Sequence, residues 1–278
     1  MLCRAMTVSV WYKKEDKKGF CGKKPRISME TDKLYRVVKE DLPKLEQLLG
    51  RCFAKDPLYE TLIPDETIRE RLLPELFHSD LTEFFESCQI FADSPALNGI
   101  LVVEDEAQPC SFWHHLHARA KAELYTDSCL IREDPSLKTL GNFMKGGDYL
   151  NERWTEELHE TQRLHIIYLA VDPDMQHRGI AAQLMNAAID YAEEKKLMVS
   201  LETHNARNLA FYHQFGFEVY EVVEKNFKLK QYCLIRKAQT EPEAVREQRE
   251  SIGRRSRTAE QRSRTAKPAA GRVGLGSI

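Results

Sequence analysis

The sequence predicts an α/β protein in which helices flank a mixed β-sheet and one helical segment is inserted before the central strands. Three observations point to this class. Short apolar and β-branched runs alternate with segments of helical periodicity, a strand at 164–171 leads through a short loop into an amphipathic helix, and residues 109–160 show no strand alternation. With 278 residues, of which 42% are hydrophobic, the chain is long enough for one large, elaborated core.

The first elements are a strand and two helical regions. The β-rich stretch 34–38 precedes a periodic segment that we expect to begin with Asp41 as a cap and Pro43 in the first turn. A second helical region over 67–86 contains Pro74, which lacks an amide hydrogen, so we expect an interruption there.

Two strands and an insertion follow. Residues 89–92 and 100–103 are strand-like runs separated by turn residues, which is typical of a β-hairpin. The polar segment 109–160 then breaks the pattern, and we interpret it as a helical insertion.

The carboxyl-terminal half returns to alternating elements. The strand at 164–171, a helix from 179 to 196 and a strand at 197–202 form one strand-helix-strand unit. A helix over 208–215 should end at Gly216, since glycine tolerates the left-handed conformation that closes many helices. The last expected strands are 217–223 and 227–236.

Charge divides the chain into three parts. Residues 1–30 carry 8 basic and 3 acidic side chains, and residues 238–278 carry 9 and 5, so both ends are basic. Residues 31–237 carry 24 basic and 35 acidic side chains, a net charge of −11. We expect a flexible basic arm (1–30), a globular domain (31–237) and a disordered basic tail (238–278). The acidic domain argues against nucleic-acid binding.

Neither a membrane span nor secretion is indicated. The mean hydropathy is −0.51, no run of 18 apolar residues exists, and no cleavage pattern follows the mildly apolar first 12 residues. The seven cysteines are odd in number and form no close pairs. We therefore expect reduced thiols and a cytoplasmic protein.

The most informative segment is the loop at 176–181, where a buried strand passes into an amphipathic helix. The first amides of a helix have no acceptor within the helix and lie at the positive end of its dipole, so they attract anions. Gly179 leaves room for a bulky anion such as a pyrophosphate. This loop is a candidate anion cradle.

A set of residues around this loop resembles a known family. The pattern Gln-x-x-Gly-x-Ala after Leu-Ala-Val-x-Pro, followed by an asparagine, a tyrosine and Gly-Phe at fixed distances, is similar to the GCN5-related N-acetyltransferase (GNAT) family. These residues are Leu169 to Val171, Pro173, Gln176, Gly179, Ala181, Asn205, Tyr212, Gly216 and Phe217. Ala181 stands where many members have glycine, a small departure because alanine suits a helix.

The resemblance, which covers about 34–237, implies the fold, the donor substrate and its contacts. The sheet should be splayed between the strands that end at Val171 and Glu202, with the pantetheine of acetyl-CoA in the split. Backbone amides of the loop would bind the pyrophosphate, and an N–H near Leu169 or Ala170 would polarise the thioester carbonyl. The expected CoA-binding residues are Leu169, Ala170, Val171, Gln176, His177, Arg178, Gly179, Ile180, Ala181, Asn205 and Asn208.

The resemblance also suggests catalytic residues. Tyr212 matches the family tyrosine that protonates the departing CoA thiolate or donates a hydrogen bond to it. The alternative is a tyrosine on the apolar stripe of its helix that only packs in the core. His165 is the first candidate for the base that deprotonates the acceptor amine, because it precedes Leu169 by four residues and should share its strand face. Glu202 and His204 are alternatives.

No metal site is expected. His114, His115 and His117 lie close together in the insertion, but only the first and last would share a helical face and no partner motif completes a zinc site. The insertion can equally serve as a lid over the acceptor pocket or as a purely structural element.

Together these features predict an acetyl-CoA-dependent N-acetyltransferase that acts on a small-molecule amine by direct attack in a ternary complex. Acetylation of a peptide or protein amine is the alternative within the enzyme class. A non-catalytic CoA-binding regulatory protein is the alternative outside it. The acceptor's identity and the oligomeric state do not follow from the sequence.

Overall fold

The computed structural model describes residues 33–107, 112–150 and 153–238, with the side chains of 112–119 and 153 left out. The expected basic arm and nearly all of the expected basic tail lie outside these ranges. Within them, strands form one seven-stranded sheet in the order β1-β2-β3-β4-β5-β7-β6. The strands are β1 (Tyr35–Arg36), β2 (Gln89–Ala92), β3 (Gly99–Asp105), β4 (Arg163–Val171), β5 (Met198–Thr203), β6 (Glu218–Val223) and β7 (Gln231–Arg236).

The sheet is mixed, because only β4 and β5 run parallel. The helices are α1 (Leu42–Phe53), α2 (Pro57–Leu62), α3 (Glu66–Ser87), α4 (Phe112–Glu133), α5 (Lys138–Lys145), α6 (Ile180–Lys195) and α7 (Leu209–Gln214). Short 3-10 helices are η1 (Lys39–Asp41), η2 (Gly147–Tyr149), η3 (Arg153–Leu158), η4 (Pro173–Met175) and η5 (Ala206–Asn208). In the described ranges no helix is long and apolar enough to cross a bilayer.

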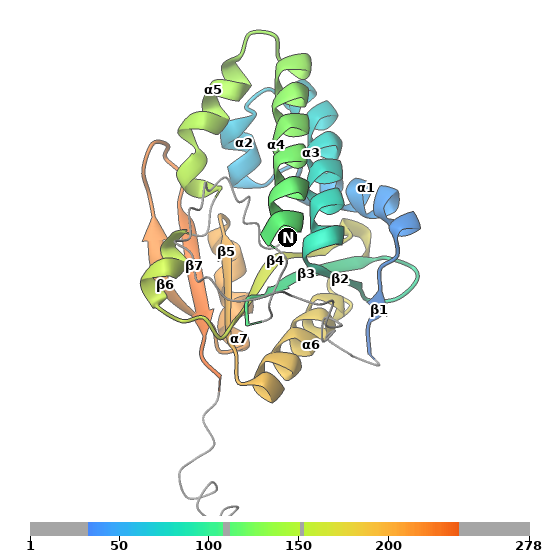
Figure 1. The fold of residues 1–278 in the computed structure, drawn as a ribbon, viewed down its shortest axis with the longest axis vertical. Helices are drawn as coiled ribbons and strands as arrows, with labels where there is room; N and C mark the ends of the chain where they lie inside the picture. Colours follow the sequence, from blue (N-terminus) through green and yellow to red (C-terminus); the bar gives the residue numbers. More distant parts are fainter. Residues whose placement is uncertain (1–32, 108–111, 151–152, 239–278) are drawn as a thin grey trace, which may run out of the picture. The chain divides into compact units, whose positions relative to one another are not determined.

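Helices cover both faces of the sheet, as Figure 1 shows. Helices α1 to α5 contribute to one apolar core, which includes Ile100, Val102 and Ala170 of the sheet. Helices α6 and α7 contribute to a second core with their sheet neighbours Leu101 and Leu169. Because successive strand residues point to opposite faces, a strand that is buried on both faces has a continuously apolar sequence. Strand β4 meets this description, with all nine residues buried.

A β-bulge in β4 interrupts this alternation. Val102 pairs with Tyr168 and Val103 with Ile166, so Ile167 is the extra residue. As a result Ile166 packs with α6, whereas Ile167 and Tyr168 both pack with the helices of the opposite face. Across the bulge the alternation of β4 side chains between the two faces of the sheet therefore shifts by one residue.

Most predicted elements are confirmed. The hairpin of β2 and β3 is present, and the strand-helix-strand unit of β4, α6 and β5 is parallel. Helix α7 ends where expected, with Gly216 at φ +78°. Helix α2 begins at Pro57 with Asp56 as its N-cap and was not predicted, because its six residues are too few for a periodic pattern.

Asp41 is the N-cap residue of α1 and Pro43 lies in the first turn, as predicted, although the Asp41 carboxylate accepts from the Val38 amide and not from an amide of α1. One detail of the prediction was wrong. Pro74 does not interrupt α3, which runs through it over 22 residues. A proline inside a helix is unfavourable, but the buried Leu73 and Leu76 beside it supply packing that offsets this cost.

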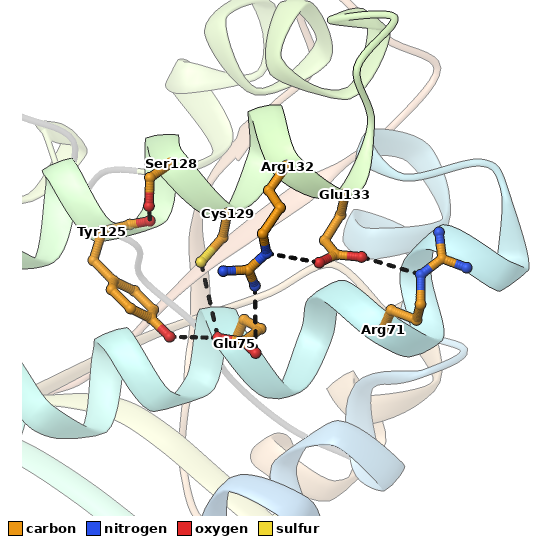
Figure 2. A network of polar contacts seen from close by, with 7 residues as sticks. All are labelled: Arg71, Glu75, Tyr125, Ser128, Cys129, Arg132 and Glu133. Atoms are coloured by element: carbon orange, nitrogen blue, oxygen red, sulfur yellow. Dashed lines mark hydrogen bonds and ion pairs between the residues drawn. The ribbon is translucent and has the colours of Figure 1, made fainter.

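The inserted segment docks α4 against α3. Figure 2 shows the polar contacts between them, in which Glu75 of α3 accepts the hydrogen bond of Tyr125 and lies 3.4 Å from Arg132. Arg71 and Glu133 form an ion pair at 3.0 Å. The Glu75 carboxylate raises the pKa of the Tyr125 phenol by holding its proton. Because these groups are partly exposed, solvent screens the contacts and each contributes little, so the buried apolar side chains of α4 contribute more.

The turn from α4 to α5 is held by one buried carboxylate. Asp134 accepts hydrogen bonds from the Ser136 hydroxyl and amide, and from the Thr139 amide at 2.9 Å and hydroxyl at 2.8 Å. These donors, Ser136 first, lower the pKa of Asp134 to about 2. The turn thus has a fixed geometry, which sets where α5 lies.

Gly99 allows α6 to approach β3 closely, because it has no side chain. A Cβ at this position would lie 2.7 Å from Cγ2 of Ile180 and 3.3 Å from the carbonyl oxygen of Ala170. We expect Gly99→Ala to lower the free energy of unfolding by about 1–3 kcal/mol through overpacking, measured by urea denaturation.

Gly141→Ala is the matched control. Gly141 lies within α5, and nothing lies within 4 Å of the Cβ it would acquire. Since alanine favours helix, this variant should be as stable as the wild type or more stable by up to about 1 kcal/mol. Equal stability of both variants would contradict the proposed close approach.

Candidate functional site

The loop between β4 and α6 is the first part of the site. Gln176 to Gly179 follow the single turn η4, and His177 and Gly179 adopt left-handed conformations with φ of +61° and +84°. Residues 177–179 are exposed, and nothing lies within 4 Å of a Cβ built on Gly179. Glycine takes the conformation of Gly179 without steric cost. Gly179 therefore turns the chain sharply into α6 with open space beside it.

The start of α6 offers amide groups to a ligand. Gly179 is the N-cap, and as glycine it has no side chain to accept from the first-turn amides. Over 16 residues the helix dipole adds positive potential at this end. Ile180 and Ala181 at the start of the helix are half-buried, so the cradle is mounted on packed structure.

Contacts from α1 hold the loop in place. The Val171 carbonyl accepts hydrogen bonds from the Cys52 thiol at 3.2 Å and from the Gln176 side chain at 3.3 Å. Arg51 forms an ion pair with Asp172. Burial raises the pKa of the Cys52 thiol to about 12, so it stays protonated and able to donate.

The second part of the site is a gap between β4 and β5. Their parallel pairing runs from Arg163–Met198 to Ile166–Leu201 and ends there, although β4 continues to Val171. Beyond this point β4 keeps its pairing with β3, and β5 keeps its pairing with β7. The splayed sheet is therefore confirmed. The backbone of 167–171 forms the β4 side of the gap.

Tyr212 lies in the core on the α6 face. Its side chain is fully buried, and its ring meets that of Phe217 edge-on at 5.9 Å. It belongs to the same apolar cluster as Leu169 and Leu201, which border the gap. The tyrosine is thus a packed core residue, and its role toward a leaving group stays a prediction.

Asn205 and Asn208 organise the segment after β5. The Asn205 side-chain oxygen accepts from the Arg207 amide at 3.1 Å and so caps η5. Asn208 donates to the Thr203 hydroxyl at 3.0 Å. Both side chains are half-buried and have structural partners, and their contact with CoA stays a prediction.

His165 lies on the face opposite to Leu169. We expected the two to share a face from their four-residue spacing, and this was wrong because the bulge at Ile167 lies between them. The histidine is fully buried. Its Nδ1 lies 2.8 Å from the Ser200 hydroxyl, and its Nε2 lies 3.3 Å from Oε2 of Glu202.

This histidine is part of a buried polar cluster that the sequence did not reveal. Trp154 of η3 donates its indole N–H to Oε1 of Glu202. His204 contacts the Gln231 side chain at 3.1 Å. Trp154 comes from the inserted segment and Glu202 from β5, so no local pattern signals that they meet. A lone tryptophan in a polar segment is a weak hint.

The same face of the sheet is covered by α5 and η2. Asn142 of α5 donates to the Leu62 carbonyl at the end of α2 at 3.0 Å. The Tyr149 hydroxyl of η2 accepts from the Lys225 amide at 2.6 Å, and Asn226 donates to the Lys145 carbonyl at 2.8 Å. The inserted segment thus joins α2 to the loop between β6 and β7.

Metal ligands are not assembled in the part of the chain that the structure describes, where no group of three suitable side chains was found. The side chains of His114, His115 and His117 lie outside the described residues. The described cysteines, Cys52, Cys88, Cys129 and Cys233, are thiols.

Comparison with known proteins gives concordant matches. The model of the acetyltransferase (GNAT) family matches residues 68–217. An uncharacterized N-acetyltransferase of Methanocaldococcus jannaschii is 36% identical over 76 residues, which are 26% of this chain and 33% of that protein. The chain therefore matches about a third of the length of this curated relative.

Solved structures of other proteins are similar to this chain. The structure described as histone acetyltransferase HPA2 and related acetyltransferase from Corynebacterium glutamicum is 16% identical, with a TM-score of 0.51 over 75% of this chain and 97% of that one. The PaiA N-acetyltransferase of Thermoplasma acidophilum, solved in complex with coenzyme A, is 14% identical, with a TM-score of 0.43 over 73% and 97%.

Proposed function

The chain belongs to the acetyltransferase (GNAT) family, and on this premise we propose that it transfers the acetyl group of acetyl-CoA to the primary amine of a small molecule. The family uses acetyl-CoA as donor. The proposed reaction is a direct attack in a ternary complex, without a covalent acyl-enzyme. A cytoplasmic location is part of this proposal.

The gap between β4 and β5 is the observation that carries the proposal. An extended ligand such as pantetheine can add to a strand whose backbone groups lack a neighbouring strand. Leu169, Ala170 and Val171 lie on the β4 side of this gap, and the loop 176–181 follows directly. The loop amides would bind the pyrophosphate of the same molecule, since residues 177–179 are exposed and lie at a helix start.

The chemistry needs few side chains at the thioester. A backbone N–H near Leu169 would polarise the thioester carbonyl, and Tyr212 would give its proton, or a hydrogen bond, to the departing sulfur. Reference pKa values are about 10 for tyrosine and about 8.5 for a thiol, so full proton transfer from tyrosine to the thiolate is uphill. A hydrogen bond from Tyr212 to the sulfur avoids that cost. The buried polar pair of His165 and Glu202 supplies the proton acceptor on the opposite face.

The covered face of the sheet favours a small acceptor. Helix α5 and η2 bridge α2 and the loop between β6 and β7, so a long peptide would have to pass beneath them. The net charge of −11 in residues 31–237 suits a cationic amine. A peptide amine is the second candidate, and a CoA-binding regulator without turnover is the third.

Turnover with an amine panel tests the proposed function. The full chain should be stabilised by acetyl-CoA in a thermal-shift assay and should release free thiol with at least one small amine. Peptides with a free amino terminus form the second arm. Stabilisation without thiol release from any amine would favour the non-catalytic regulator, and release with peptides only would favour the second candidate.

Gly179→Ala should weaken acetyl-CoA binding. A side chain disfavours the left-handed conformation by roughly 1–2 kcal/mol, so the loop would rearrange and turn its amides away from the pyrophosphate. We expect an affinity loss of about tenfold or more by isothermal titration calorimetry. Gly141→Ala, whose new methyl group also meets open space, should bind normally. Unchanged affinity in the first variant would argue against the cradle.

Tyr212→Phe should lower turnover without weakening acetyl-CoA binding. Losing a hydroxyl that assists the leaving sulfur should reduce kcat by about 10²-fold, while the aromatic packing against Phe217 remains. Steady-state kinetics and calorimetry measure the two effects, and thermal unfolding checks the fold. Wild-type turnover would remove the acid role from this residue.

A further inference from the structure

The closed end of the gap between β4 and β5 limits the space for an acyl group, an inference that rests on the proposed function. The loop 176–181 follows β4, so a pantetheine whose pyrophosphate binds there would run back along β4 toward lower residue numbers. Its thioester would lie near Leu169, and the acyl group would come next. Pairing of β4 with β5 resumes at Ile166, opposite Leu201. Residues 167 and 168 therefore separate the expected thioester from the closed end.

The β-bulge places both of these residues on one face of the sheet. Ile167 and Tyr168 belong to the core under α1 to α5, whereas a regular strand would turn one side chain to each face. They are 4% and 0% exposed. The next residue of β4 on this face is Ala170, whose side chain is a single methyl group. Side-chain size thus rises abruptly in the direction in which an acyl chain would extend.

The Tyr168 side chain is held at both its ring and its hydroxyl. Its ring centroid lies 5.8 Å from that of Phe53, and 5.9 Å from those of Phe77 and Phe84. Its hydroxyl donates to the carboxylate of Asp80, which is 7% exposed. Phe77, Asp80 and Phe84 follow one another on α3 at spacings of three and four residues, so one helix face supplies all three contacts. The ring is therefore fixed in a packed aromatic cluster.

The α6 face is filled in the same region. Leu169, Leu201 and Tyr212 are fully buried there and belong to one apolar cluster. The Tyr212 ring also packs edge-on against Phe211 and Phe217, with 5.5 and 5.9 Å between centroids. Because protein interiors are close-packed, an acyl chain that turned toward this face would have to displace these side chains.

We propose that Tyr168 limits the length of the acyl group that the protein accepts, and that Asp80 is a positioning residue that holds the tyrosine ring in place. An acetyl group has one methyl carbon beyond its carbonyl and would end before the ring. A hexanoyl group has four further methylene groups, and these would overlap the ring. The preferred donor would therefore be acetyl-CoA rather than a thioester of a longer acid.

Binding of two thioesters to the full chain tests this proposal. The affinities for acetyl-CoA and hexanoyl-CoA are measured by isothermal titration calorimetry without any amine, and their ratio gives the acyl preference. The wild type should bind hexanoyl-CoA no more tightly than acetyl-CoA. Tyr168→Ala should shift the ratio toward hexanoyl-CoA by at least about tenfold, because each methylene buried in the new space contributes about fourfold in affinity.

Three further variants isolate the effect of the ring. Phe84→Ala removes another ring from the same cluster but leaves Tyr168 in place, and Tyr168→Phe removes only the hydroxyl. Both should keep the wild-type ratio within about threefold. Tyr168→Leu keeps more of the core packing than Tyr168→Ala, so it serves where loss of the whole ring prevents folding. It should shift the ratio toward butyryl-CoA.

The possible results separate this inference from the proposed function. A wild-type ratio in both Tyr168→Ala and Tyr168→Leu would overturn the inference. An equal shift in Phe84→Ala would also overturn it, because any cavity in the cluster would then suffice. The titrations contain no amine, so they decide the acyl preference even if the wild type acetylates nothing. Such an absence of turnover would contradict the proposed acetyl transfer alone.

Discussion

The parting of β4 from β5 is the constraint on which the rest of the structure depends. A buried strand normally pairs on both sides, because unpaired backbone groups are costly away from water. Strand β4 is held without its second neighbour by the full length of β3 and by contacts from α1 to Val171 and Asp172. The stretch of β4 beyond Ile166 is thus held in place without pairing to β5, and it is there that the proposed ligand would add.

The residues of the proposed site lie on both faces of the sheet. The α6 face carries the loop with Gly179 and the core that contains Tyr212. The opposite face carries Glu202 and its two supporting side chains beneath the inserted segment. One bulged residue, Ile167, makes this division possible, because it lets β4 present consecutive residues to the same face beside the gap. In the proposed reaction, the groups that bind the donor and those that receive the acceptor would thus lie on opposite faces of the sheet.

Much of the fold follows from local patterns. Continuous apolar runs predicted β4 and β5, helical periodicity predicted α6, and Gly216 marked the end of α7. The loop at 176–181 was found because a glycine at a helix start has a direct physical meaning. The failure at Pro74 has an equally clear reason, because tertiary packing outweighs the local cost of a proline inside a helix.

The polar cluster shows the limit of the sequence. By itself the sequence determined the class of fold, the family and the loop that offers amides to an anion, since these depend on residues close together in the chain. The tertiary structure alone decided that Trp154, His165 and Glu202 meet, and that His165 faces away from Leu169. Three separate segments converge there, and a single bulge changes the facing of a whole strand, which no residue pattern records.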